Sequence, residues 1–229
     1  MESSEKKEIV RSIFLPILFV VITWFIKISE FYTHNSFSYF GIKPRDTFGL
    51  LGIIFSPFLH SDFEHLWANS IPILILSVGI FYFYKQIAFK TIGLMWFLTG
   101  LGVWIMGRTS YHIGASGLIY AFTTFLFFSG ILRKYMPLIA ISLLVAFLYG
   151  SLVWGIFPME TGISWEGHLM GFLAGIVVAF FYKSEGPQRK KYVWELEDDD
   201  DENQDTSISI TDTYDVNYIY KESENANVK

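Results

Sequence analysis

Long apolar stretches recur along this chain, and they restrict its fold more than any other feature. Each is close to the ~20 residues that a helix needs to cross the ~30 Å hydrocarbon core of a bilayer. Inside a bilayer the backbone must satisfy its own hydrogen bonds, so runs of this length form helices. We therefore predict an all-α membrane protein with six transmembrane helices. The predicted spans are residues 13–29, 64–84, 91–107, 114–132, 136–156 and 166–182, and we expect the third and sixth to be short or tilted.

The composition agrees with this class. Hydrophobic residues make up 52% of the chain and charged residues only 17%, whereas a soluble domain carries about 25% charged residues. The chain has no cysteine, which excludes disulfides, thiolate nucleophiles and Cys-based metal sites. The N-terminal stretch MESSEKKEIVR leads into the first apolar run without a small-residue cleavage site, so we expect that run to remain as a helix.

The polar segments predict the domain organisation. Residues 1–12 form the N-terminus, and residues 13–184 form the membrane domain. Within it, residues 30–63 are too long and too mixed for a simple turn, so we predict a structured first loop at the membrane surface. Residues 185–229 contain ELEDDDDENQD and few apolar side chains, which predicts a disordered acidic tail.

The basic residues predict the orientation. Cytoplasmic loops of membrane proteins carry an excess of Lys and Arg. Eleven basic residues fall on the side of the termini, and four fall on the other side. We therefore expect both termini in the cytoplasm and the loop 30–63 outside. The eleven are Lys6, Lys7, Arg11, Lys85, Lys90, Arg133, Lys134, Lys183, Arg189, Lys190 and Lys191, and the four are Lys27, Lys43, Arg45 and Arg108.

In this topology, polar side chains from three spans meet at one depth. Ser116 lies 17 residues before Arg133, His168 lies 15 before Lys183, and Asn69 lies 16 before Lys85. At ~1.5 Å per helical residue these side chains differ in depth by about 3 Å. His65 is one turn further out on the face of Asn69. Polar groups inside a span are costly and tend to mark a functional interior.

Each of these residues also has a simpler interpretation. A lone Ser usually bonds its own helix, a lone His near a helix end is often interfacial, and Asn often joins helices. Together, a Ser and a His at one depth are the minimum for a hydroxyl nucleophile and its base. An Asn and a second His beside them could donate hydrogen bonds to an oxyanion. Serines 70, 77, 110, 129 and 142 are expected to have no imidazole at their depth.

Small residues predict that the fourth and sixth spans touch. In GHLMGFLAG, Gly171 and Gly175 follow His168 at i+3 and i+7 on one helix face. Gly117 and Ala121 form a small-xxx-small pair on the fourth span, and such pairs let membrane helices approach closely. Tyr120, one turn after Ser116, could pack beside the imidazole, or it could serve packing alone.

These motifs resemble those of the rhomboid family of intramembrane serine proteases, over about residues 13–183. HLWAN fits the family's His-x-x-x-Asn, GASG its nucleophile motif, Tyr120 its aromatic one turn later, and HLMGFLAG its His-x-x-Gly-x-x-x-Gly. The resemblance implies Ser116 as nucleophile and His168 as general base, without a carboxylate. Glu166 faces elsewhere on the same helix. The resemblance further implies an oxyanion hole from Asn69, His65 and the Ser116 N–H, supported by Gly114, Gly117, Gly171 and Gly175.

The resemblance also carries expectations about substrates. It implies hydrolysis near the outer ends of transmembrane segments in other membrane proteins, from a water-filled cavity open to the outside. Six spans without an extra flanking one resemble the simpler, prokaryote-like form, which implies the cytoplasmic membrane of a bacterium as the location. No metal, cofactor or nucleic acid is expected. The chain departs from many bacterial members in one respect, because no Trp-Arg pair occurs between residues 30 and 63.

Two alternatives to a protease remain. An inactive rhomboid-like protein would bind client helices without cutting them, although we would expect it to lose Ser116 or His168. A transporter or channel would carry polar residues through the whole depth of the bilayer. The inner halves of the second, fourth and sixth spans are almost wholly apolar, which disfavours a pathway.

Overall fold

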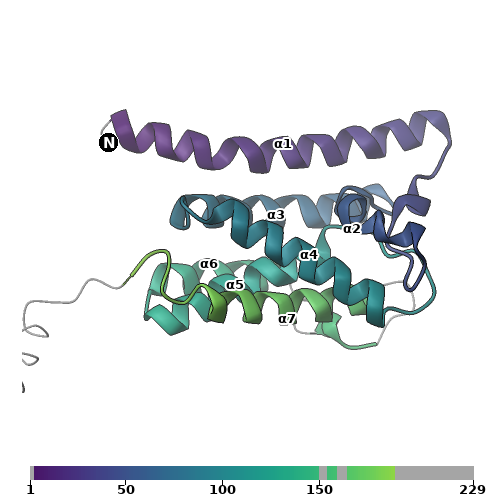
Figure 1. Cartoon of the computed structure of the whole chain (residues 1–229). Helices are drawn as coiled ribbons and strands as arrows, with labels where there is room; N and C mark the ends of the chain where they lie inside the picture. Colours follow the sequence, from purple (N-terminus) through teal and green to yellow (C-terminus); the bar gives the residue numbers. More distant parts are fainter. Residues whose placement is uncertain (1–2, 150–153, 159–163, 189–229) are drawn as a thin grey trace, which may run out of the picture. The chain divides into compact units, whose positions relative to one another are not determined.

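The computed structural model of the protein describes residues 3–149, 154–158 and 164–188. These residues form seven α-helices and several 3₁₀ turns, with no strand among them (Figure 1). The predicted all-α class is therefore confirmed for the described residues. The predicted acidic tail, residues 185–229, lies outside the described residues from 189 onward.

Four of the long helices, α3, α4, α5 and α7, follow their predicted spans closely. The first helix, α1, begins earlier than expected, at Ser3 instead of residue 13. The described helices long and apolar enough to cross a membrane are Ile9–Thr33 within α1, α3, α4 and α5. The bounds are Ser3–Thr33 for α1, Phe63–Phe83 for α3, Ala88–Met106 for α4, Ser116–Arg133 for α5, Met136–Tyr149 for α6 and Trp165–Phe181 for α7.

The fifth predicted span, residues 136–156, is wrong in its extent. Helix α6 has 14 residues, about 21 Å of helix at 1.5 Å per residue. Residues Trp154–Ile156 form a separate 3₁₀ turn, η4. Within the described residues α6 and α7 are thus shorter, with 14 and 17 residues, than α4 in the third position, which has 19. The sixfold crossing of the membrane stays a prediction.

The segment between α1 and α3 is folded onto the helices through short turns of its own. Trp96 Nε1 of α4 donates to the Ile53 carbonyl at 2.6 Å, and Trp104 Nε1 donates to the Asp46 carbonyl at 2.8 Å. A two-way backbone bridge joins Ile42 to His112. The turns are η1 at Ser38–Phe40, η2 at Phe48–Leu50, α2 at Gly52–Phe55 and η3 at Ser56–Phe58.

Helix α5 is the centre of the bundle and packs most extensively against α7. Its side chains Ile119, Phe125 and Leu126 are fully buried. Lipid tails are as apolar as Leu, so membrane helices associate through close packing of small residues. A Cβ at Gly171 would overlap the Gly117 carbonyl, and one at Gly175 would overlap the Ala121 carbonyl. The predicted close approach of these two helices is therefore confirmed.

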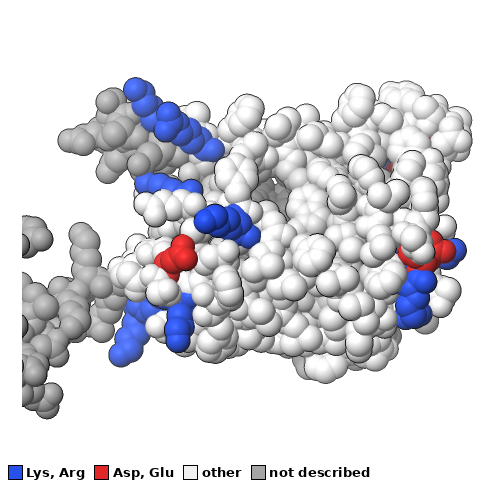
Figure 2. Space-filling view, viewed as in Figure 1, with Lys and Arg blue, Asp and Glu red and all other residues white. Residues whose placement is uncertain are grey.

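On the face shown in Figure 2, the charged side chains lie at the two ends of the bundle. Figure 2 shows Lys and Arg side chains gathered at the end where α1 begins, and a second charged group at the opposite end. The band between them is uncharged on this face. Helix α1 exposes large apolar side chains, among them Phe14, Val21 and Phe25. An apolar band of this kind suits lipid contact, and the chain is an integral membrane protein.

Candidate active site

The structure brings Ser116 and His168 into hydrogen-bond contact. Ser116 is the first residue of α5, and His168 lies in the first turn of α7. The Ser116 Oγ lies 2.9 Å from the His168 Nε2. Both side chains are buried, with exposed fractions of 6% and 7%. A hydroxyl and an imidazole held in this way can form a nucleophile and general base.

The other nitrogen of His168 sets the direction of that hydrogen bond. The His168 Nδ1 lies 2.8 Å from the Gly155 carbonyl oxygen. A carbonyl can only accept, so Nδ1 carries the proton and Nε2 of the neutral ring is left to accept from Ser116. Sequence reasoning missed Gly155, because a backbone carbonyl leaves no signal in the sequence and residues 136–156 were expected to be one helix.

Tyr120 holds the plane of the imidazole. Its ring is stacked on that of His168, with centroids 4.3 Å apart and planes 13° apart. Gly155 packs against the same rings, because a Cβ added there would lie 3.0 Å from the His168 Nδ1. Of the two roles left open for Tyr120, packing alone and contact with the imidazole, the structure favours contact.

Gly114 has a backbone conformation and a neighbour that both require glycine. Its φ is +110°, a region that side chains other than glycine rarely adopt. An added Cβ would lie 2.8 Å from Cε1 and 3.1 Å from Nε2 of His65. The His65 ring therefore packs against the backbone two residues before Ser116.

His65 and Asn69 lie on one face of α3, as their spacing predicts. The Asn69 Nδ2 donates to the His65 carbonyl at 2.9 Å, and Asn69 is only 1% exposed. The His65 Nδ1 lies 3.2 Å from the Ser61 Oγ. The Nε2 edge of His65 is thus turned toward Gly114 and the start of α5. An oxyanion role for either residue is a proposal, taken up below.

His60 is a neighbour of the site that sequence reasoning missed. Its ring meets that of His65 edge to face, with centroids 5.0 Å apart. The Ala115 N–H donates to its Nε2 at 3.4 Å. Burial, the largest influence, lowers the pKa of His60 to about 3, so the ring is neutral at pH 7. His60 precedes His65 by five residues across a turn, and helical periodicity does not extend through a turn.

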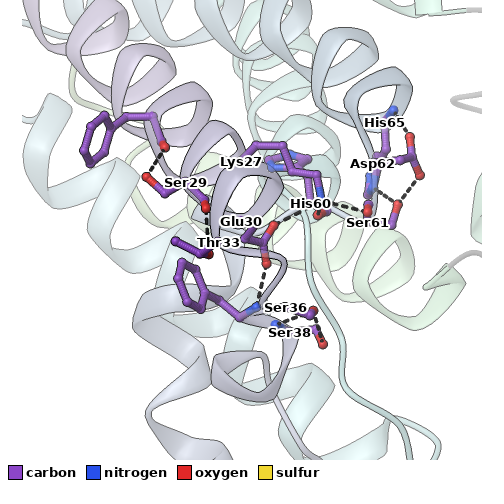
Figure 3. A network of polar contacts seen from close by, with 12 residues as sticks. Lys27, Ser29, Glu30, Thr33, Ser36, Ser38, His60, Ser61, Asp62 and His65 are labelled. Atoms are coloured by element: carbon purple, nitrogen blue, oxygen red, sulfur yellow. Dashed lines mark hydrogen bonds and ion pairs between the residues drawn. The ribbon is translucent and has the colours of Figure 1, made fainter.

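Lys27 of α1 anchors the segment that carries His60. Its ammonium donates to the His60 carbonyl at 3.0 Å and to the Ser61 carbonyl at 2.8 Å. It also pairs with Glu30 at 3.0 Å. Figure 3 shows Lys27 reaching from its helix to this segment, with Asp62 and His65 beyond. The lysine ties α1 to the start of α3.

One expectation about the other serines is wrong. The Ser110 Oγ lies 3.4 Å from the Nε2 of His112, although no imidazole was expected at its depth. Ser70 and Ser77 each donate to a carbonyl of their own helix, as a lone Ser in a membrane helix usually does. The loop before α5 folds back on itself, and a count of residues along a helix cannot show that.

Glu166 is directed away from the His168 pair. Its Oε1 accepts from the Arg108 backbone N–H at 3.2 Å and pairs with the Arg108 Nε at 3.4 Å. The Glu166 carboxylate therefore faces Arg108 and not the imidazole of His168. Among the described residues, no group of three or more His, Cys, Asp or Glu side chains could hold a metal ion.

Comparison with known proteins decides the family. The family model described as the rhomboid domain matches residues 47–185, more than half of the chain. The chain belongs to the rhomboid family. Proteins of Mycobacterium bovis and Mycobacterium tuberculosis are 36% identical to it over 186 residues, covering 75% of each chain. A Mycobacterium leprae protein is 32% identical over 182 residues, covering 75% of this chain and 71% of its own. These relatives are described as uncharacterized, and no solved structure matches.

Proposed function

We propose that this rhomboid protein is an intramembrane serine endopeptidase that cuts transmembrane segments of other membrane proteins near their outer ends. Membership of the family supports a serine protease. The single observation that carries the proposal is the 2.9 Å contact between Ser116 Oγ and His168 Nε2, with Nδ1 held by the Gly155 carbonyl.

The proposed chemistry begins with a proton transfer. A serine hydroxyl is a weak nucleophile unless a base accepts its proton. His168 Nε2 takes the Ser116 proton as Oγ attacks the scissile carbonyl carbon, and then gives that proton to the leaving amine. An acyl group remains on Ser116. Water then attacks the acyl carbon while His168 again accepts a proton, which releases the acid and restores the hydroxyl.

The charge that develops on the carbonyl oxygen needs donors. The N–H groups in the first turn of α5 have no acceptor within their own helix, and the Ser116 N–H is among them. We assign His65 as a further donor because its ring lies beside the Gly114 backbone, and Asn69 because it lies one turn later on the same face of α3 and donates to the His65 carbonyl. Loss of one such donor typically costs ~10²–10³ in turnover.

A small cavity beside Ser116 offers a place for the hydrolytic water. Its volume is about 40 Å³, and Ser116, Thr99 and Gly114 are among its lining residues. A single water needs ~10–15 Å³ of such space. The Thr99 hydroxyl is buried without a hydrogen-bond partner in the described part of the chain. A water in the cavity would satisfy that hydroxyl and lie near the acyl group.

The same residues favour the protease over the two alternative functions. An inactive client-binding relative has no need for the oriented Ser116–His168 pair. A polar pathway would need hydroxyls that face a channel, yet Ser77 and Thr124 donate to carbonyls of their own helices. We therefore keep the client-binding protein as the second candidate, because family membership alone is compatible with it.

A fluorophosphonate probe tests the proposal directly, because it traps activated serines. The purified protein in detergent or liposomes should be labelled at Ser116. Labelling should vanish in Ser116→Ala, fall strongly in His168→Ala, and persist in Ser70→Ala, a matched serine without a base. Cleavage of a model transmembrane substrate should follow the same order. Equal labelling without His168 would refute the dyad, and an inert intact protein that still binds a model helix would favour the client-binding candidate.

A further inference from the structure

The loop that precedes Ser116 contacts the start of α7 through two side-chain interactions. Neither interaction takes part in the proposed chemistry. Residues 107–115 connect α4 to α5. At one end of this loop Arg108 bonds Glu166. Near the other end the His112 Nδ1 lies 2.6 Å from the Ser164 Oγ. Ser164 is the N-cap of α7, and Glu166 lies in its first turn, which also carries His168.

His112 is held so that its hydrogen bond to Ser164 has one direction. Its Nε2 lies 3.0 Å from the Arg108 carbonyl oxygen, so Nε2 must carry a proton. His112 is only 4% exposed, and burial, the largest influence, lowers its pKa, although the Arg108 carbonyl and Glu166 act to raise it. The ring is therefore neutral, and its Nδ1 accepts a hydrogen bond from the Ser164 hydroxyl.

Ser164 uses its hydroxyl in an unusual way for its position. It is the N-cap of α7, where a serine side chain usually accepts from an N–H of the first turn. Here the side chain makes no capping hydrogen bond. The Ser164 carbonyl accepts from the N–H groups of Gly167, at 3.0 Å, and His168, at 3.3 Å. Ser164 thus contacts His112 through its side chain and accepts a hydrogen bond from the His168 backbone through its carbonyl.

The backbone of His112 is fixed as well. Its N–H donates to the Ile42 carbonyl at 2.8 Å, and its carbonyl accepts from the Ile42 N–H at 3.0 Å. Two residues later, the Gly114 N–H donates to the Ser56 carbonyl at 2.9 Å. Backbone hydrogen bonds therefore hold the loop between His112 and Ser116 in place. The hydrogen bond between His112 and Ser164 joins this loop to the helix that carries His168.

We propose that His112 is a positioning residue, whose hydrogen bond with Ser164 sets the first turn of α7 against the nucleophile loop and so sets the distance between Ser116 and His168. This inference rests on the proposed protease function, which supplies the activity to be measured. It predicts an effect on turnover with little effect on substrate affinity, because His112 acts on the reacting pair and not on the substrate.

Two conservative variants separate the two hydrogen bonds of the ring. In His112→Asn, an amide oxygen stands the same number of bonds from Cα as Nδ1, so it can accept from Ser164. In His112→Gln, an amide nitrogen stands where Nε2 does, so it keeps the bond to the Arg108 carbonyl and loses the bond to Ser164. Misplacement of reacting groups by 1 Å costs ~10²-fold, and the remaining tie through Arg108 limits the effect to about tenfold.

The experiment measures kcat and KM for a model transmembrane substrate, the fluorophosphonate labelling rate and the thermal unfolding midpoint. His112→Asn should retain kcat within about threefold, while His112→Gln and Ser164→Ala should each lose about tenfold at unchanged KM. The double variant His112→Gln/Ser164→Ala should lose no more than either single one, since both remove one hydrogen bond. Ser110→Ala, which alters another hydroxyl near the same ring, serves as the control and should behave like the intact protein.

The outcomes distinguish this inference from the proposed function. If the intact protein neither labels nor cleaves, both fail. If the intact protein is active and His112→Asn is as impaired as His112→Gln, the bond to Ser164 does not position the pair and this inference alone is overturned. A loss of about a hundredfold in the double variant would also overturn it, because independent effects multiply.

Discussion

The contact between α5 and α7 should set the rate of the proposed reaction, and Gly171→Ala tests this. Gly171 lies one turn after His168, and its partner Gly117 directly follows Ser116. A Cβ at position 171 would lie 3.0 Å from the Gly117 carbonyl carbon, closer still to its oxygen, and 3.2 Å from the Tyr120 Cβ. Carbon and oxygen atoms rest at about 3.3–3.6 Å, so the two helices must separate by on the order of 1 Å.

That separation would lengthen the distance between Ser116 and His168. The Ser116–His168 distance is now 2.9 Å, and an added ~1 Å takes it beyond the length of a hydrogen bond. Misplacement on this scale costs ~10²-fold in rate, while overpacking costs about 1–3 kcal/mol of stability. We therefore expect Gly171→Ala to fold with a lowered unfolding midpoint and to lose about two orders of magnitude in kcat.

Gly93→Ala is the matched control. Gly93 lies within α4, and a Cβ added there meets nothing within 4 Å. Alanine is the better helix former by about 1 kcal/mol, so this variant should be as active as the intact protein and no less stable. The assay compares substrate cleavage and fluorophosphonate labelling for both variants in the same liposomes. Intact kinetics in Gly171→Ala would refute the argument that backbone contact between these helices sets the geometry of the pair.

Four further predictions follow from particular residues. Asn69→Ala should slow turnover by up to ~10²–10³-fold while leaving residual activity. Unchanged kinetics would indicate that Asn69 only joins helices. Because the pKa of His60 falls from 6.5 to about 3 in the folded protein, the unfolded chain binds the extra proton between these values. Folding stability should therefore drop as pH falls from 6.5 toward 3, by up to about 1.4 kcal/mol per pH unit, and His60→Asn should flatten this slope in denaturation measurements; an equally steep slope would contradict it. Truncation before Lys190 should leave cleavage largely intact, because the rhomboid domain match ends at residue 185; abolished cleavage with normal membrane insertion would show that the tail takes part. Reporter fusions should place both termini in the cytoplasm, and a fusion after residue 158 found there as well would overturn the orientation.

The sequence by itself determined the helices and the pairing of Ser116 with His168. Apolar runs of about 20 residues leave few alternatives to helices in a bilayer, so α3, α4, α5 and α7 lie within a few residues of their predicted bounds. Counting along those helices predicted one level for Ser116, His168 and Asn69, because the rise per residue is constant, and the structure joins Ser116 to His168. The glycines at 117, 171 and 175 marked the faces that touch, since only small residues permit such approach.

The tertiary structure alone decided what orients these groups. The Gly155 carbonyl, the His60 ring and the His112–Ser164 hydrogen bond all come from turns between helices. Helical periodicity says nothing about the path of a turn, and backbone groups are the same in every residue, so no sequence pattern marks a carbonyl that accepts from His168. The 3₁₀ turn at Trp154–Ile156, within the predicted fifth span, was hidden for a related reason. Hydrophobicity records which residues can lie in lipid, whereas the position at which a helix ends depends on where its neighbours pack.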